Sequence, residues 1–258
     1  MKIMLTGHRG FIGSHLVKRL TRNHSVVGID LRDGWDRDRL NNSQDLLDCP
    51  LNEEFDLIIH LAGKSGVRDS VGDPEGYWRN NVEVSKRLFA RYPGTRILYA
   101  SSSSAYEPDL NPYAASKYIV EEAASRHEDS LGMRFHTVWS DTPRSGMFLD
   151  KFFNNKLEYI TNHYRDFIHI SDVCTAIELC IKSNYNGIID IGTGMPFKIS
   201  DFSPDLPVKI HTPNERSWTC ANTDRLKTLG FNPKHSVENL LTNQLNDNIV
   251  VLHERKDK

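Results

Sequence analysis

An excess of one charge and any long apolar run are both missing from this sequence. Its 32 Lys and Arg residues nearly balance 34 Asp and Glu residues, for a formal net charge of −2. Nucleic acids and membrane surfaces bind clustered cations, so we expect neither as a partner. No apolar run approaches the ~20 residues that cross a bilayer, and no basic segment followed by an apolar stretch opens the chain. The cytoplasm is therefore the expected location.

Cysteine is scarce, and neither cysteine nor histidine occurs at a metal-binding spacing. The four cysteines, Cys49, Cys174, Cys180 and Cys220, form no C-x-x-C pair, and the eleven histidines form no H-x-x-x-H pair. We therefore expect no metal site. Internal repeats, low-complexity tracts and Gly/Ser linkers are missing as well, which predicts an integral chain without tethered modules.

What the sequence does contain is an alternation of short apolar runs with helical patterns. This alternation is typical of βαβ units, so it predicts an α/β fold with a Rossmann-type doubly wound parallel sheet. The predicted strands are residues 2–5, 25–29, 57–61, 96–100, 134–138 and 187–191. One helix is predicted to begin at Phe11, and two more are predicted over residues 82–92 and 113–126.

From Asp141 onward the pattern loosens into short apolar clusters with several prolines. This change predicts a small C-terminal substrate-binding lobe packed on the sheet. We therefore divide the chain into a Rossmann domain over residues 1–145 and a mainly substrate-binding lobe over residues 146–258. Residues 165–192 are expected to return to the Rossmann domain.

A glycine loop directly follows the first predicted strand and opens the first helix. Gly7, Gly10 and Gly13 permit a tight turn, a close approach of the backbone to a pyrophosphate, and close packing of helix on strand. Phe11 and Ile12 lie inside this loop at the helix N-terminus, whose free N–H groups and partial positive charge favour phosphate. The loop, in this context, predicts a dinucleotide site.

Asp30 ends the second predicted strand, where a carboxylate accepts hydrogen bonds from the adenosine ribose and repels a 2′-phosphate. It therefore predicts NAD as the cofactor and residues 1–145 as an NAD-binding domain. Nearby Arg32 leaves NADP open, because a cation there can accommodate the 2′-phosphate.

A serine run and a Tyr-x-x-x-Lys pair give the sharpest chemical signal. Residues 101–104 are all serines that follow a predicted strand, at the sheet edge where open α/β proteins bind ligands. Tyr113 and Lys117 lie four residues apart, and so on one face of a helix. A cation beside a phenol favours the phenolate, which can take a proton from a hydroxyl while hydride leaves the same carbon for nicotinamide. The set predicts redox catalysis.

Together these residues resemble the extended short-chain dehydrogenase/reductase family, in particular its NAD-dependent sugar-nucleotide epimerases and dehydratases. The resemblance covers most of the chain, including the residues 60–63, the Tyr77-x-x-x-Asn81 pair and the residues 165–172. It implies cofactor contacts, at the adenine from Asp45 and Leu46 and along the dinucleotide from Leu61, Ala62, Gly63, Asn81, Tyr113 and Lys117.

The resemblance also implies roles on the substrate side of the site. It places the catalytic hydroxyl on Ser102 and the nucleotide diphosphate on Arg165 and Arg216. Ser103 and Ser104 are implied substrate contacts. They stand where 4,6-dehydratases carry an Asp-Glu pair and where GDP-fucose synthase carries a cysteine, so neither of those two chemistries is equipped here.

The serine run, together with residues 66–70, is most similar to UDP-glucuronate and other UDP-hexose 4-epimerases. The implied activity is NAD-dependent 4-epimerisation of a UDP-hexose through a 4-keto intermediate, with the nucleotide sugar as partner and a homodimer formed through two helices. Two alternatives stay open: an NAD(P)-dependent reductase or dehydratase of a sugar nucleotide, and a non-catalytic dinucleotide sensor. Fold alone does not separate them.

Three features depart from the family pattern. The chain is shorter than is usual in the family, which implies a trimmed substrate lobe. Residues 139–141 read Trp-Ser-Asp where the family usually has Tyr-Gly-Pro, and Glu107 replaces a glycine expected after Tyr106. These departures bear mainly on the identity of the substrate.

Overall fold

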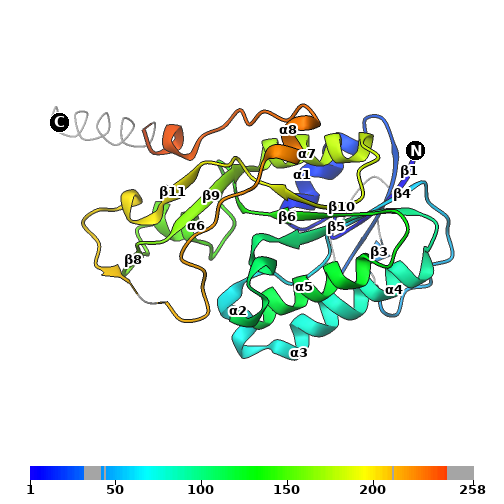
Figure 1. Cartoon of the computed structure of the whole chain (residues 1–258), viewed down its shortest axis with the longest axis horizontal. Helices are drawn as coiled ribbons and strands as arrows, with labels where there is room; N and C mark the ends of the chain where they lie inside the picture. Colours follow the sequence, from blue (N-terminus) through cyan, green and yellow to red (C-terminus); the bar gives the residue numbers. More distant parts are fainter. Residues whose placement is uncertain (32–41, 44, 211, 243–258) are drawn as a thin grey trace.

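Seven parallel strands form the central sheet of this computed structural model, in the order β10-β6-β5-β4-β1-β2-β3 (Figure 1). The structure describes residues 1–31, 42–43, 45–210 and 212–242. The strands are β1 (Lys2–Thr6), β2 (Ser25–Asp30), β3 (Asn42–Ser43), β4 (Leu57–His60), β5 (Arg96–Ser102), β6 (Ser130–Phe135) and β10 (Gly187–Ile191). The chain runs outward from β1 in one direction and then in the other, which confirms the doubly wound Rossmann prediction. The strand order reverses beside β1, the point at which such sheets bind ligands.

Helices cover both faces of this sheet (Figure 1). One face carries α1 (Phe11–Leu20), α7 (Ile170–Lys182) and α8 (Asp224–Thr228), and the other carries α2 (Val67–Gly72), α3 (Pro74–Tyr77), α4 (Val84–Arg91) and α5 (Pro112–Ala124). Leu16 and Ile177 belong to the core on the first face, while Leu88 and Val120 belong to the core on the second. Burial of both faces explains why the strands read as continuous apolar runs without alternation.

A smaller lobe lies beyond the carboxyl ends of the sheet strands (Figure 1). Its elements are β7 (Thr137–Trp139), β9 (Tyr164–His169) and β11 (Pro196–Lys198) in one sheet, β8 (Ile160–Thr161) and β12 (Val208–Lys209) in another, and helix α6 (Phe148–Phe153). The Phe202 ring packs at centroid distances of 5.0 to 5.4 Å against four other rings, those of Phe148, Phe152, Phe167 and Phe197. Within residues 165–192, β9 pairs in the small sheet and β10 pairs in the large sheet. Helix α7 packs on one face of the large sheet.

The predicted strand over residues 134–138 is wrong in its bounds. β6 ends at Phe135, and after His136 the chain enters β7 in the other sheet. The His136 backbone N–H still donates to the Ile191 carbonyl at 3.0 Å, so the chain leaves the large sheet directly after this bond. Periodicity cannot mark this transfer, because the pairing partner of a β-branched segment is decided by tertiary contacts. The predicted helix over residues 82–92 instead begins as a π-helix, Trp78–Glu83, and continues as α4.

One buried carboxylate organises the lobe beside β9. Asp166 is fully buried and accepts hydrogen bonds from the Thr193 backbone N–H at 2.8 Å and hydroxyl at 2.7 Å. It also accepts from the backbone N–H groups of Gly194 at 2.8 Å and Ala221 at 3.0 Å. Two loops from different parts of the chain are thereby fixed to β9.

Two short turns and a helix cap bring the serine run close to α5. β5 is followed by 3₁₀ turns over Ser103–Tyr106 and Pro108–Leu110, and then by α5. Asn111 caps α5, because its Oδ1 accepts the Ala114 backbone N–H at 2.8 Å. Pro112 occupies the first helical position, where the missing N–H costs nothing because an N–H there would have no partner inside the helix. Local sequence therefore fixes the start of the helix that carries the predicted catalytic pair.

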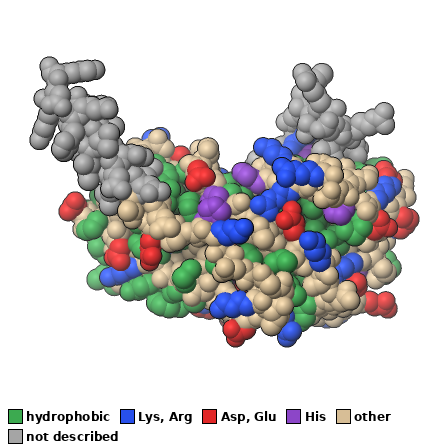
Figure 2. Space-filling model, turned by 90° about the horizontal axis from the view of Figure 1, so that it is seen from above, with side chains coloured by type: hydrophobic (Ala, Val, Ile, Leu, Met, Phe, Trp, Pro, Cys, Tyr) green, Lys and Arg blue, Asp and Glu red, His purple; other side chains and the backbone are tan. Residues whose placement is uncertain are grey.

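Charges of both signs are interspersed on the face that Figure 2 shows, with Lys, Arg and His side chains gathering near its middle. Within the described ranges, none of the helices combines the length and apolar character that a bilayer crossing requires.

Candidate active site

The glycine loop between β1 and α1 has a backbone that leaves no space for side chains. Gly7 has a φ of +70°, and a Cβ atom there would lie 2.6 Å from the Ala62 backbone nitrogen. A Cβ atom on Gly13 would lie 2.1 Å from the Gly7 carbonyl oxygen. Gly10 occupies the N-cap position of α1, and no side chain caps this helix. At these glycines the predicted loop therefore brings its backbone close to the N-terminus of α1 without intervening side chains.

Phe11 and Ile12 form the first turn of α1, where backbone N–H groups have no partner inside the helix. Such groups suit a pyrophosphate. Asp30, at the end of β2, accepts the Arg9 backbone N–H at 2.9 Å, so its carboxylate borders the loop. Arg32, on which the NADP alternative rests, lies outside the described residues.

Asp45 and Leu46, the predicted adenine contacts, follow β3. Asp45 accepts the Leu47 backbone N–H at 2.9 Å and pairs with Arg79 at 2.6 Å. The backbone hydrogen bond, followed by the bond to Arg79, lowers the pKa of Asp45 against the opposing effect of burial. The Leu46 side chain is buried in the core, and its carbonyl accepts a hydrogen bond from Arg87.

A buried histidine links the end of β1, where the glycine loop begins, to helix α4. The His60 ring contacts the Thr6 hydroxyl at 2.7 Å through Nδ1 and the Ser85 hydroxyl at 2.9 Å through Nε2. Since Ser85 donates to the Asn81 carbonyl, neutral His60 donates from Nε2 and accepts at Nδ1. Burial, followed by the charge of Lys117, lowers the pKa of His60 to about 3. The ring is therefore neutral at physiological pH.

Leu61, Ala62 and Gly63 continue from β4 past this network, as predicted cofactor-lining residues. Asn81 fixes the end of this segment, accepting the Lys64 backbone N–H at 2.7 Å and donating to its carbonyl at 3.1 Å. The same amide donates to the Ser116 hydroxyl on α5 at 2.9 Å. Asn81 therefore ties the predicted cofactor loop to the helix of the predicted catalytic pair.

The structure brings Ser102, Tyr113 and Lys117 together at the carboxyl edge of the sheet. Ser102 ends β5, and its hydroxyl lies close enough to the Tyr113 phenol to lower the pKa of that phenol. The buried Lys117 Nζ donates to the Ala100 carbonyl at 2.9 Å and lies 6.0 Å from the Tyr113 ring centroid. Tyr77 packs edge-to-face on Tyr113, with the two centroids 6.0 Å apart.

Opposing effects act on the two titratable groups of this set. Burial raises the pKa of Tyr113, while the Ser102 hydroxyl and the charge of Arg144 lower it. Burial lowers the pKa of Lys117 to about 8, against the opposing charge of Glu121. A positive charge brought close to the Tyr113 oxygen would lower the pKa of the phenol and favour the phenolate.

The predicted diphosphate contact Arg165 lies on β9. Its Nη1 donates to the Tyr164 carbonyl at 2.9 Å, and Nη2 lies 3.8 Å from Glu215. Burial lowers the pKa of Arg165, so an anionic partner stabilises this cation. Arg68, from α2, pairs with the same Glu215 at 2.7 Å.

Arg216 lies against the serine run. Its Nε donates to Glu107 at 2.7 Å, and its Nη1 donates to the Ser103 carbonyl at 2.7 Å. Ser104 is half-buried, and its backbone N–H donates to the Ser102 hydroxyl at 3.1 Å. The predicted substrate contacts of the serine run and Arg216 thus occupy one edge of the site.

Sequence reasoning missed two cations at this edge. They are Arg68 and Arg144, to which the sequence analysis assigned no role in the site. Arg144 donates to the Ser65 hydroxyl at 2.9 Å, and its charge acts on Tyr113. The segment after β7 is irregular, so no periodicity in the sequence could indicate where this side chain lies.

These features define a class: a Rossmann-fold, nicotinamide-dependent enzyme in which a Ser-Tyr-Lys set lies at the same edge of the sheet as a glycine loop. A family model described as the NAD dependent epimerase/dehydratase family matches residues 3–192. This chain belongs to that family. The match bears out the expected family and its NAD dependence.

Curated relatives and solved structures are similar over nearly the whole chain. Protein CapI of Staphylococcus aureus is 25% identical over 318 residues, spanning 92% of this chain and 95% of the relative. The uncharacterized UDP-glucose epimerase YtcB of Bacillus subtilis (strain 168) is 28% identical, spanning 95% and 97%.

Among structures, MoeE5 in complex with UDP-glucose and NAD has a TM-score of 0.83 at 27% identity, covering 98% of this chain and 100% of its own. UDP-glucuronic acid 4-epimerase from Bacillus cereus, in complex with UDP-glucuronic acid and NAD, has a TM-score of 0.81 at 25% identity, covering 94% and 97%.

Proposed function

We propose that this protein is an NAD-dependent sugar-nucleotide epimerase that inverts C4 of a UDP-hexose through a 4-keto intermediate. The observation that carries the proposal is the meeting of Ser102, Tyr113 and Lys117 at the carboxyl edge of the parallel sheet, the edge at which the glycine loop follows β1. The UDP-sugars and NAD in the similar solved structures support the same assignment.

The residues of the nucleotide site fit NAD. A Cβ atom on Gly7 or Gly13 would collide with backbone, so this loop can lie directly against a pyrophosphate at the α1 N-terminus. Asp30 would hold the adenosine ribose, and the backbone of Leu61 and Ala62 lies against Gly7. Asp45 and Asn81 are further cofactor contacts in this proposal. The chemistry that NAD supplies when bound is reversible acceptance of hydride at the nicotinamide.

In the proposed reaction Tyr113 acts as the base and then as the acid. Its phenolate takes the proton of the sugar C4 hydroxyl as that carbon becomes a ketone, and later returns the proton to the oxygen of the inverted product. The Ser102 hydroxyl hydrogen-bonds to the same oxygen, and Lys117 stabilises the phenolate by its charge. Proton and hydride both return to the sugar, so no net redox change occurs.

The substrate side would be held by cations and hydroxyls. Arg165 and Arg216 bind the diphosphate in this proposal, since guanidinium groups match phosphate oxygens in geometry and charge. Ser103 and Ser104 lie at the sugar end, next to Ser102. A homodimer and a cytoplasmic location stay predictions.

The direct experiment uses purified, NAD-loaded protein with UDP-glucose, UDP-galactose, their N-acetyl forms and UDP-glucuronate. We expect interconversion of one 4-epimeric pair, measured by chromatography or NMR, with no accumulation of NADH. Failure of all these substrates to epimerise would refute the UDP-sugar assignment. Stoichiometric consumption of NAD(P)H would instead indicate the sugar-nucleotide reductase.

Replacing Lys117 by Met is expected to lower kcat by about 100-fold near pH 7, because the phenolate loses its cation. The pKa of Lys117 lies at about 8, so the wild-type side chain loses its own charge as the pH rises through that value. The ratio of wild-type to variant kcat should therefore shrink between about pH 7 and pH 10.

The control for this prediction is Lys86→Met. It removes an exposed lysine on α4 whose Nζ lies over the Trp78 ring. Its kcat should match the wild type at every pH. A Lys117→Met ratio that stays constant across the range would contradict the assigned role.

A further inference from the structure

Three consecutive residues of the C-terminal lobe contact three different segments at the active-site edge. The Asn214 carbonyl accepts a hydrogen bond from the Asn111 side chain at 3.0 Å. Glu215 accepts from Arg68 at 2.7 Å, and Arg216 donates to Glu107 at 2.7 Å. We call residues 214–216 the strap.

The backbone of the strap explains how neighbouring residues reach such different partners. Asn214 has a φ of +67°, in the left-handed region that asparagine tolerates better than most residues. Asn214 lies in a turn in which the Glu215 backbone N–H donates to the Thr212 carbonyl at 3.4 Å, directly before the contact of Arg216 to Glu107.

The strap contacts the two segments that carry Ser102 and Tyr113. Arg216 donates to the Ser103 carbonyl at 2.7 Å, one residue beyond Ser102. On the other side, the Asn111 Oδ1 caps α5 while its Nδ2 is bonded to the strap, and Tyr113 lies in the first turn of that helix. One short segment therefore touches the turn of the serine and the cap of the tyrosine helix.

The strap and the residues that directly follow it contact the strand of the predicted diphosphate contact, and Glu215 of the strap lies 3.8 Å from the Arg165 Nη2. The Tyr164 backbone N–H donates to the Ser217 carbonyl at 2.8 Å, and the Thr219 N–H donates to the Tyr164 carbonyl at 3.1 Å. Arg165 directly follows Tyr164 on β9. A phosphate held by Arg165 is thereby connected through backbone hydrogen bonds to the strap.

We propose that Glu107 and Asn111 are positioning residues, which hold the strap so that Ser102 and Tyr113 stay aligned on a substrate bound at Arg165 and Arg216. This inference rests on the proposed epimerase function and adds two residues to it. Arg216 serves both ends of the link. Its Nε and Nη1 hold the serine turn, while its Nη2 makes no hydrogen bond to any residue in the described ranges and would donate to a phosphate oxygen.

The alternative is that these contacts only stabilise the fold. The Glu107 side chain is 50% exposed, and ion pairs of such exposure typically contribute little to stability. A role in stability alone therefore predicts a small change in melting temperature and no change in turnover. Misplacement of a catalytic group, in contrast, lowers kcat strongly.

The test compares Glu107→Gln and Asn111→Ser with the wild type, as NAD-loaded full-length protein. Serine keeps an oxygen that can cap α5 but lacks the Nδ2 donor to the strap, so the helix cap is preserved. We expect each variant to lose about 10-fold in kcat with less than about a 3-fold change in KM for the UDP-sugar. Melting temperature and NADH affinity should match the wild type.

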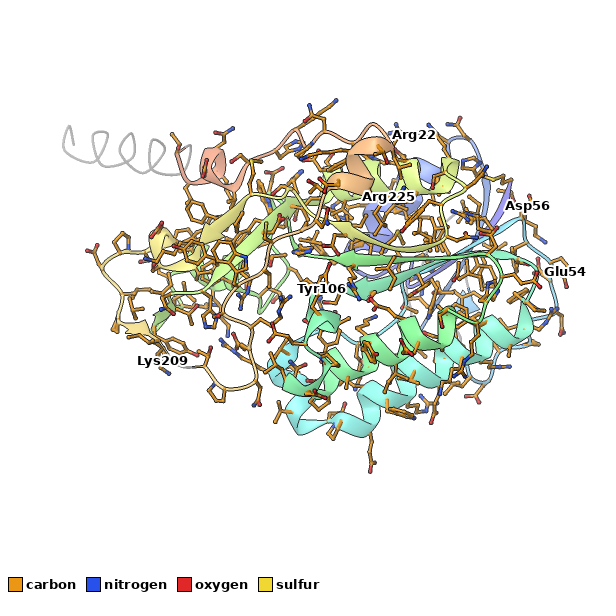
Figure 3. All side chains as sticks on the ribbon, viewed as in Figure 1. Arg22, Glu54, Asp56, Tyr106, Lys209 and Arg225 are labelled. Carbon is orange, nitrogen blue, oxygen red and sulfur yellow. The ribbon has the colours of Figure 1, made fainter. Side chains whose placement is uncertain are left out.

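Glu54→Gln is the matched control, because Glu54 forms an exposed ion pair with Arg91 at 3.1 Å at the opposite end of the sheet. Figure 3 shows this separation, with Tyr106 at the lobe-facing end of β5 and Glu54 at the other end. The kcat and KM of Glu54→Gln should equal those of the wild type.

The double variant Glu107→Gln with Arg216→Gln should lose less in kcat than the product of the two single losses, because both substitutions act through one contact.

The outcomes separate the two proposals. A wild-type protein without epimerase activity refutes the proposed function, and the positioning roles with it. An active wild type whose Glu107→Gln and Asn111→Ser variants keep normal kcat overturns the strap inference alone. A raised KM at unchanged kcat also overturns it, because Glu107 would then act only on substrate binding.

Discussion

The Tyr113→Phe variant is expected to lose at least about 1000-fold in kcat while it still binds NAD. The change removes one oxygen atom, and with it the group that exchanges a proton with the C4 hydroxyl in the proposed reaction. The ring remains, so its edge-to-face contact with Tyr77 at 6.0 Å is kept and the fold should be unaffected. The measurement is kcat with the epimerised UDP-sugar, alongside the NADH dissociation constant from fluorescence.

The matched control is Tyr118→Phe, on the same helix but 39% exposed and outside the site. It removes the same atom and should leave kcat unchanged. An active Tyr113→Phe variant would discredit Tyr113 as the base. Loss of both turnover and NADH binding would point to a disturbed cofactor site and would equally fail to support the role.

A second large effect is expected from Gly13→Ala, which should abolish NAD binding and lower the melting temperature by about 10 °C. The added Cβ would lie 2.1 Å from the Gly7 carbonyl oxygen and 2.7 Å from the His8 Cα atom. Both neighbours are backbone, so the loop can relieve the collision only by moving away from α1. Such a movement disturbs the N–H groups that the pyrophosphate requires.

Gly72→Ala provides the comparison, because nothing lies within 4 Å of a Cβ atom at that position. Calorimetry should place its melting temperature at or slightly above that of the wild type, since alanine restricts the unfolded chain. NAD titration should find its affinity unchanged. A Gly13→Ala protein with normal melting and normal NAD affinity would show that the loop does not hold the cofactor.

The parts of the molecule that local sequence determines were predictable. The glycine loop, the helix from Phe11 and the strands β1, β2, β4 and β5 follow from periodicity and turn residues, because neighbouring residues specify them. The four-residue spacing of Tyr113 and Lys117 likewise fixes their common helix face. The seven-stranded order confirms the fold class that these local patterns predicted.

The parts that depend on distant contacts were not predictable. Arg68 and Glu215 are 147 positions apart in the sequence, and Glu107 and Arg216 are 109 apart. No pattern within either segment contains information about such a pairing. The same reason explains the missed strand change at His136, where the next residues pair with β9 and leave the large sheet.

Asp166 shows how a lobe with little regular structure can still be well defined. Pairing of a segment with a strand fixes its backbone through hydrogen bonds from several residues on each side. Here a single carboxylate receives three backbone N–H groups and one hydroxyl, and so replaces a strand as the organiser of two loops. The order of both loops therefore depends on one side chain. Either loop can become shorter in evolution only while its N–H groups still reach that carboxylate.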